Sequence, residues 1–110
     1  MQIEVQHTEN ISIATLQGEV DLSNSPEART VILDCLNDGR SLLVNLEAVS
    51  YIDSSGIASL VEGFQYARSN NLDFGLLGVS EAAMNVLRLA RLDQVFHIYD
   101  SLEDRIDRGD

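Results

Sequence analysis

The stretch Val49-Ser50-Tyr51-Ile52-Asp53-Ser54-Ser55-Gly56-Ile57 contains a change from one kind of secondary structure to another. An apolar, strand-like run stops at Asp53, and apolar residues with helical spacing follow at once. The residues with this spacing are Ile57, Leu60, Val61 and Phe64. The first N–H groups of a helix lack intrahelical partners and lie at the positive end of its dipole, so they stabilise a serine oxygen or a phosphate bound to it. The stretch therefore predicts two hydroxyls at a helix start, where they suit either a helix cap or a phosphorylation site.

Strand-like and helical segments alternate in the amino-terminal half of the chain. Polar and apolar positions alternate on either side of Thr8-Glu9-Asn10, which predicts two short strands in an antiparallel pair within the first eighteen residues. Asn24-Ser25-Pro26-Glu27 has the composition of a helix start, and we expect Gly39 to end that helix. The run Leu42-Leu43-Val44-Asn45-Leu46 then predicts a central strand that is buried on both faces.

The alternation continues in the carboxyl-terminal half. We expect the helix after Asp53 to end near Asn70-Asn71 and the next strand to be Phe74-Gly75-Leu76-Leu77-Gly78-Val79. Ser80 can cap a third helix, and residues 95–99 predict a last short extended segment before an acidic tail helix or a frayed end. Strands separated by helices pair in parallel through right-handed crossovers. We therefore expect a small α/β fold, a single domain over residues 1–110, whose mixed sheet has an antiparallel start and helices packed against it.

Composition and charge restrict the classes of partner. The chain has 110 residues, of which 45% are hydrophobic, and its formal net charge is −11. Nucleic-acid binding needs a basic surface that displaces counterions, so this charge argues against a nucleic-acid partner and against an anionic membrane surface. The first residues contain no basic cluster and no long apolar run, and no segment has the apolar length of a membrane span. We expect a cytoplasmic protein that does not insert into a membrane.

Other reactive residue types give little support for a catalytic or metal site. Cys35, the one cysteine, falls on the apolar stripe of the first predicted helix, where we expect it to be a small buried hydrophobe. His7 and His97 are far apart in sequence and fit no metal-binding spacing. A hydrolase triad of Ser54, His97 and an aspartate would lack the Gly-x-Ser-x-Gly nucleophile elbow.

The residues around Ser54 each allow more than one interpretation. Asp53 can assist a helix cap, orient Ser54 or meet the metal site of a kinase. We expect the Ser55 hydroxyl to satisfy a backbone group, with a second phosphorylation site as the alternative. Gly56 allows either a close approach of the helix start to a neighbouring strand or partner, or a turn with unusual dihedrals. We expect Ile57 to belong mostly to the core, with part of its surface shared with a partner.

Three blocks of the sequence together resemble STAS domains, specifically the free-standing anti-sigma factor antagonists of bacteria. The blocks are residues 16–21, 46–57 and 95–103, with the sequences LQGEVD, LEAVSYIDSSGI and VFHIYDSLE. They follow the order of the family and span nearly the whole chain. STAS domains also occur in stressosome proteins, in the small subunit of phospholipid ABC transporters and at the end of sulfate transporters. The resemblance therefore specifies the fold more closely than the role.

The resemblance implies a partner-switching regulator and no enzyme, with no catalytic residue, metal or cofactor of its own. The unphosphorylated form would bind an anti-sigma factor of the GHKL ATPase fold, which would phosphorylate Ser54 with ATP and dissociate. A PP2C-type phosphatase would reverse the modification. The residues implied to bind the partner are Asp21, Asp53, Ser55, Gly56 and Ile57. The alternative is a non-switching STAS subunit of a phospholipid ABC transporter or of a stressosome-type assembly. Without the resemblance, the segment from Asp21 to Asn24 has the composition of an ordinary turn.

Overall fold

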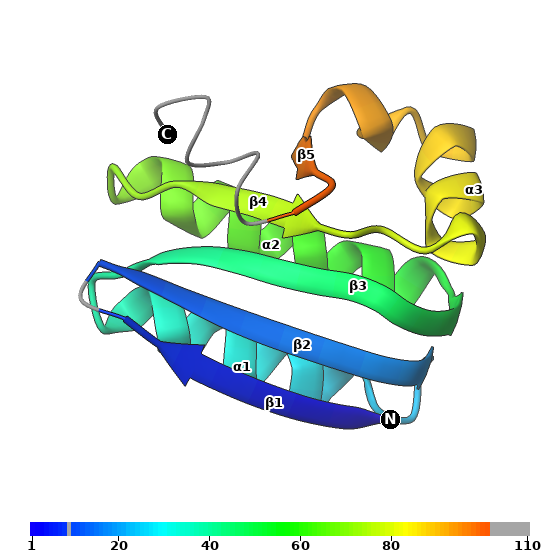
Figure 1. Ribbon diagram of the computed structural model, residues 1–110, viewed down its shortest axis with the longest axis horizontal. Helices are drawn as coiled ribbons and strands as arrows, with labels where there is room; N and C mark the ends of the chain where they lie inside the picture. Colours follow the sequence, from blue (N-terminus) through cyan, green and yellow to red (C-terminus); the bar gives the residue numbers. More distant parts are fainter. Residues whose placement is uncertain (9, 102–110) are drawn as a thin grey trace.

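The computed structural model describes residues 1–8 and 10–101 (Figure 1). The strands in this part of the chain form one mixed sheet in the order β1-β2-β3-β4-β5. The first pair is antiparallel, and the other neighbouring pairs are parallel. Their bounds are β1 Gln2–His7, β2 Ile11–Val20, β3 Ser41–Ile52, β4 Phe74–Leu77 and β5 His97–Tyr99. The α/β class and the antiparallel start predicted from the sequence are confirmed.

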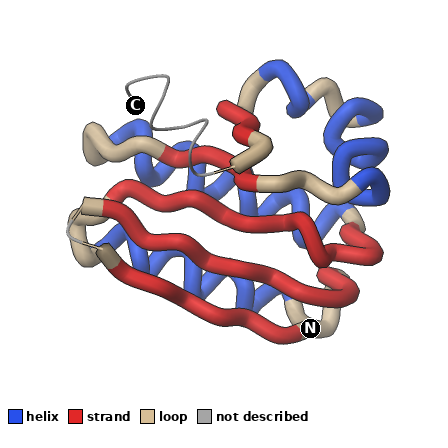
Figure 2. The backbone as a smooth tube through the Cα atoms, in the orientation of Figure 1, coloured by secondary structure: helices blue, strands red, loops and turns tan. Residues whose placement is uncertain are grey.

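Helices α1 and α2 lie on one face of the sheet, while α3 lies beside the carboxyl ends of β3 and β4 (Figure 1). Their bounds are α1 Ser25–Asn37, α2 Ser54–Ser69 and α3 Glu81–Leu89, and a short 3-10 helix, η1, covers Leu92–Gln94. The tube view in Figure 2 shows the long helices lying along the strands on one face of the sheet. Within residues 1–8 and 10–101, none of the helices combines the length and the apolar character needed to cross a bilayer.

The helix boundaries follow from local chemistry. Pro26 lies in the first turn of α1, where its missing N–H leaves no hydrogen bond unmade, and Gly39 takes a positive φ of 83° just after this helix. Ser80 accepts a hydrogen bond from the Ala83 N–H and caps α3, as predicted. The Ser80 hydroxyl also donates to the Val49 carbonyl at 2.7 Å, which fixes the start of α3 to β3.

The main core lies between the sheet and the two long helices. Strand β2 alternates strictly in its first half, so Ser12, Ala14 and Leu16 point to the helices and are buried. Cys35 of α1 is buried among them, as expected. The largest fully buried side chains include Leu16, Ile32, Leu36, Leu42, Leu46, Leu60, Leu76 and Leu87.

Several boundaries differ from the sequence prediction. The predicted central strand continues without interruption to Ile52, and only its first half is buried on both faces. The strand expected to reach Val79 stops at Leu77 because Gly78 turns the chain with a φ of 60°. The N–H groups of Val95 and Phe96 donate to the Leu92 carbonyl and continue the turn of η1, so the last extended segment shortens to His97–Tyr99. The predicted tail helix or frayed end falls on residues 102–110, outside the described part of the chain.

Gly63 allows α2 to approach α1 and β4 closely. A Cβ atom at this position would lie 2.5 Å from Ile32 Cγ2 and 2.8 Å from the Phe74 ring. Both distances are shorter than carbon atoms tolerate, so the packing requires a residue without a side chain there.

We predict that Gly63→Ala destabilises the protein. Overpacking by a methyl group costs about 1–3 kcal/mol, which exceeds the roughly 1 kcal/mol that alanine gains over glycine in a helix. Urea denaturation measures the difference, with Gln65→Ala at an exposed position of the same helix as the control. An increase in the free energy of unfolding of Gly63→Ala would contradict this packing.

Candidate functional site

The carboxyl ends of β2 and β3 lie next to each other, at the right of Figure 2. Val20 pairs with Ile52 at the end of these parallel strands, and the Asp53 N–H donates to the Val20 carbonyl at 3.1 Å. Each strand is followed directly by an aspartate, Asp21 after β2 and Asp53 after β3. Because the strands are parallel, the two turns that lead into α1 and α2 emerge at the same edge of the sheet. We call residues 19–22 and 51–55 the Ser54 surface.

The two turns of the Ser54 surface repeat one hydrogen-bonded motif. In the first turn, Asp21 Oδ1 accepts from the Ser23 N–H at 3.0 Å and from the Ser23 hydroxyl at 2.6 Å. In the second turn, Asp53 Oδ1 accepts from the Ser55 N–H at 2.9 Å and from the Ser55 hydroxyl at 2.5 Å. Such Asp-x-Ser turns fix the backbone through the carboxylate and leave the middle residue outside the hydrogen-bonded ring. The middle residues are Leu22 and Ser54, and both are exposed.

Asp53 is the N-cap of α2. Besides its two bonds from Ser55, its carboxylate accepts from the Gly56 N–H at 3.2 Å. The pKa of Asp53 lies below its ordinary value because of the Ser55 hydroxyl and the N–H groups of Gly56, Ser55 and Leu22, while partial desolvation opposes them. The cap interpretation of Asp53 is confirmed.

The two serines that the sequence places together have different environments. The Ser55 hydroxyl is held by the Asp53 carboxylate, so the expectation that it satisfies a backbone group is wrong. Ser54 is the first residue of α2 and is exposed, and its hydroxyl has no hydrogen-bond partner among residues 1–8 and 10–101. A free hydroxyl at a helix N-terminus can accept a phosphoryl group without first breaking an internal hydrogen bond.

Gly56 and Ile57 lie beneath the surface. A Cβ on Gly56 would lie 2.6 Å from Ile52 Cγ1 and 2.9 Å from Val20 Cγ1, so its close approach to the strands is confirmed. Gly56 is absent from the glycines with positive φ in the described chain, and the alternative of a turn with unusual dihedrals is therefore wrong. Ile57 is buried in the main core, as expected. A direct role of either residue in binding a partner stays a prediction.

Tyr51 and Glu19 belong to the same surface, although sequence alternation does not identify Tyr51. Gly18 pairs with Val49 but Glu19 pairs with Tyr51, so Ser50 is an extra residue in β3. This β-bulge turns Tyr51 away from the core, on which Val49 and Ile52 both pack. Tyr51 is 50% exposed and Leu22 is 76% exposed. The bulge is the reason that the apolar run in the sequence contains an outward-facing aromatic residue.

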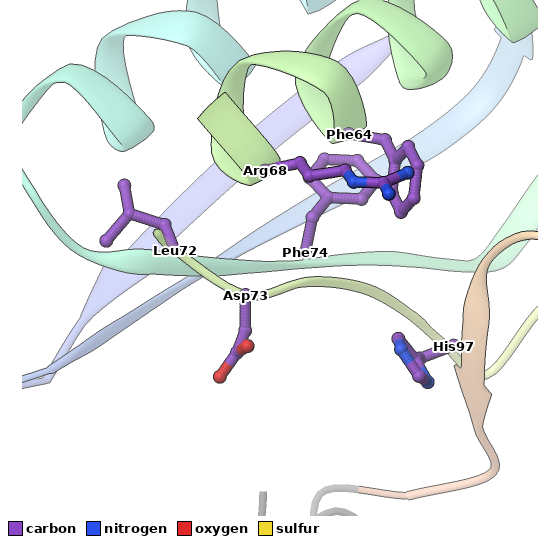
Figure 3. Close-up of a pocket in the computed structure, with 6 residues that line it drawn as sticks. All are labelled: Phe64, Arg68, Leu72, Asp73, Phe74 and His97. Atoms are coloured by element: carbon purple, nitrogen blue, oxygen red, sulfur yellow. The ribbon is translucent and has the colours of Figure 1, made fainter. Parts of the chain in front are cut away.

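A hollow lies near the carboxyl-terminal end of α2, away from the Ser54 surface (Figure 3). It has a volume of about 280 Å³ and is lined by Phe64, Arg68, Leu72, Asp73, Phe74 and His97. The α2 residues that line it, Phe64 and Arg68, follow Ser54 by ten and fourteen residues, so about 15–21 Å of helix separate them from Ser54. A triad of Ser54 and His97 is therefore wrong. His7 lies elsewhere, on β1, where its Nδ1 is 2.7 Å from the Ser12 hydroxyl.

Comparisons with known proteins agree with this architecture. The family model described as "STAS domain" matches residues 2–105. The anti-sigma-B factor antagonist of Staphylococcus aureus is 29% identical over 104 residues, covering 94% of this chain and 96% of the relative. Two solved structures of the anti-sigma factor antagonist SpoIIAA share the fold at 21% identity. The match to the unphosphorylated form has a TM-score of 0.83 and covers 98% of this chain and 96% of the SpoIIAA chain. The match to the phosphorylated form from Bacillus has a TM-score of 0.76 and covers 99% of this chain and 100% of the SpoIIAA chain.

We predict that Asp53→Asn lowers thermal stability near neutral pH, because the amide is a weaker acceptor for the start of α2. Since the pKa of Asp53 is lowered in the folded state, the stabilising effect of its charge is fully present above the ordinary pKa of 3.8. That effect is lost as the pH falls through the lower folded-state pKa. The difference in unfolding free energy between the wild type and Asp53→Asn should therefore narrow below pH 3.8.

Urea denaturation between pH 2 and pH 7 measures this dependence. Asp100→Asn, which removes the same charge from an exposed position, is the control and should change stability little. A difference for Asp53→Asn that stays constant across this range would show that its charge does not stabilise the turn.

Proposed function

This chain belongs to the STAS domain family, and we propose that it acts as an anti-sigma factor antagonist whose binding is switched off by phosphorylation of Ser54. The relative from Staphylococcus aureus is named an anti-sigma-B factor antagonist, and the match covers nearly its whole length. The observation that carries the proposal is the contrast between the two serines. Ser54 is exposed and free of hydrogen bonds within the described chain, whereas Asp53 holds the Ser55 hydroxyl. Ser54 is accordingly the phosphorylation site that we propose.

The proposed partner is an anti-sigma factor with the GHKL ATPase fold, which also acts as the kinase. The γ-phosphoryl group of ATP passes to Ser54 Oγ, the bond to the β-phosphate oxygen breaks, and ADP leaves. The hydroxyl proton passes to a base of the kinase, while Asp53 Oδ1 keeps its hydrogen bonds from the Ser55 hydroxyl and the Ser55 and Gly56 N–H groups. This chain is then the substrate and contributes no catalytic step. A PP2C-type phosphatase restores the hydroxyl by hydrolysis.

The charge of the surface explains why a phosphate would end binding. The Ser54 surface contains three carboxylates, those of Glu19, Asp21 and Asp53, and no lysine or arginine. A phosphate adds about −1.5 to −2 charges, which the start of α2 stabilises in the free protein. In a complex, the same group must lose water next to these carboxylates. Each roughly 1.4 kcal/mol of this cost lowers the affinity tenfold, so a modest penalty suffices for a switch.

The proposal places the protein in the cytoplasm, where ATP and the transcription machinery are found. The alternative, a STAS subunit of a phospholipid ABC transporter or a stressosome-type assembly, does not require a switch. Under that alternative, Ser54 would serve only as the first residue of α2. The two experiments below separate these functions.

The first experiment identifies the phosphorylated residue. The GHKL-type anti-sigma factor from the same organism is incubated with ATP and with the wild type, Ser54→Ala or Ser55→Ala. Mass spectrometry should find one phosphate on the wild type and on Ser55→Ala, and none on Ser54→Ala. Phosphate on Ser54→Ala would contradict the assignment.

The second experiment measures binding to the same anti-sigma factor by isothermal titration calorimetry. Ser54→Ala should bind like the unphosphorylated wild type, while Ser54→Asp should bind at least about tenfold more weakly because its charge must be desolvated. Aspartate also suits the first turn of a helix, so this variant should keep its fold. Equal affinities would favour the non-switching alternative.

A further inference from the structure

We propose that Leu22 and Tyr51 are the apolar anchors by which the Ser54 surface holds the anti-sigma factor. The partner would receive them in an apolar hollow bordered by basic side chains. This inference rests on the function proposed above and adds to it the residues that determine affinity for the partner. Neither side chain carries the hydroxyl that accepts the phosphoryl group, so binding of the Ser54→Ala protein measures their effect apart from the switch.

Leu22 and Tyr51 remain exposed in the folded protein although both are large apolar side chains. Across residues 1–8 and 10–101, the exposed large hydrophobic side chains are Val5, Leu22, Tyr51, Leu89 and Val95. Two of these five belong to the Ser54 surface, which contains only nine residues. Exposed apolar side chains that gather beside polar groups are typical of protein–protein contact sites, and tyrosine is enriched at their centres.

The turn after β2 presents Leu22 on a fixed backbone. Asp21 accepts two hydrogen bonds from Ser23, and the Asp21 N–H donates to Asn24 Oδ1 at 2.8 Å. Asn24 Nδ2 in turn donates to the Glu19 carbonyl at 2.9 Å, which closes the turn against β2. This bonding explains why Asn24 makes no side-chain cap for α1. A side chain on such a backbone loses little freedom on binding, so more of its burial contributes to affinity.

Tyr51 is positioned from the strand side of the same surface. It pairs with Glu19 across β2 and β3, one residue before the paired strand ends. The bulge at Ser50 directs it outward, and both neighbours in the core, Val49 and Ile52, remain buried. Leu22 therefore comes from the turn after β2 and Tyr51 from the end of β3, at one hydrogen-bonded edge of the sheet.

The chemistry of the partner follows from the charges around the anchors. Glu19 pairs with Tyr51, Asp21 directly precedes Leu22, Asp53 follows Tyr51 by two residues, and the Ser54 surface contains no basic residue. A complementary partner brings basic groups to this rim and an apolar hollow to Leu22 and Tyr51. Leu22 is the middle residue of the first Asp-x-Ser turn, and Ser54 is the middle residue of the second. A phosphate there would bring its hydration shell to the anchor and reduce its burial.

The test uses Ser54→Ala as the parent protein, so that binding is measured without phosphorylation. Leu22→Ala and Tyr51→Thr are added to it separately, and threonine is chosen because it keeps β propensity. Leu89→Ala is the matched control, since Leu89 is 87% exposed but lies at the end of α3. Affinity for the purified GHKL-type anti-sigma factor is measured by calorimetry, and circular dichroism checks the fold of every variant.

We expect Leu22→Ala and Tyr51→Thr each to weaken binding about tenfold or more, as truncation of a central interface residue does, and Leu89→Ala to leave it unchanged. If both variants bind within twofold of the parent, Leu22 and Tyr51 are not the anchors, and the proposed function still stands. A loss of equal size for Leu89→Ala would also overturn them. Absence of binding by the Ser54→Ala parent would instead overturn the proposed function, and the anchors with it.

Discussion

The carboxylate of Asp53 is the interaction on which the arrangement of the site depends. It accepts hydrogen bonds from the Ser55 hydroxyl and from the Ser55 and Gly56 N–H groups at the start of α2. Removal of the carboxyl would leave these donors without their acceptor at an edge that is only partly exposed, and protonation would leave them a weaker acceptor. The same contact selects one serine, because it occupies Ser55 and leaves Ser54 free. In the proposed function, this one side chain both caps α2 and leaves the Ser54 hydroxyl available for phosphorylation.

Parallel pairing of β2 and β3 gives the site its second property. The two strands end in register, and each continues into an Asp-x-Ser turn and a helix. One turn presents the apolar residue Leu22 and the other presents the hydroxyl of Ser54. Beneath them, Gly56 lets α2 begin against Val20 and Ile52, so the turn is supported by the core. This support makes the Ser54 surface a rigid edge, which suits recognition by a folded partner.

The order of the elements could be predicted from the sequence because it depends on local patterns. Apolar spacing after Asp53 identified α2, Pro26 marked α1, and Ser80 marked the cap of α3. Features that depend on neighbouring strands could not be predicted. The bulge at Ser50 arises from pairing with β2, so alternation alone places Tyr51 incorrectly. The roles of Ser54 and Ser55 depend on which hydroxyl reaches Asp53, and adjacent serines look equivalent in a sequence.

The most direct test of the account is an NMR titration of the ¹⁵N-labelled Ser54→Ala protein with the GHKL-type anti-sigma factor. The account predicts that the amide signals of residues 19–23 and 51–57 change most. Signals near Arg68 and His97, at the other end of α2, should change least. Changes centred on that distant hollow or on β1, with residues 51–57 unaffected, would contradict the claim that the partner binds where β2 and β3 end.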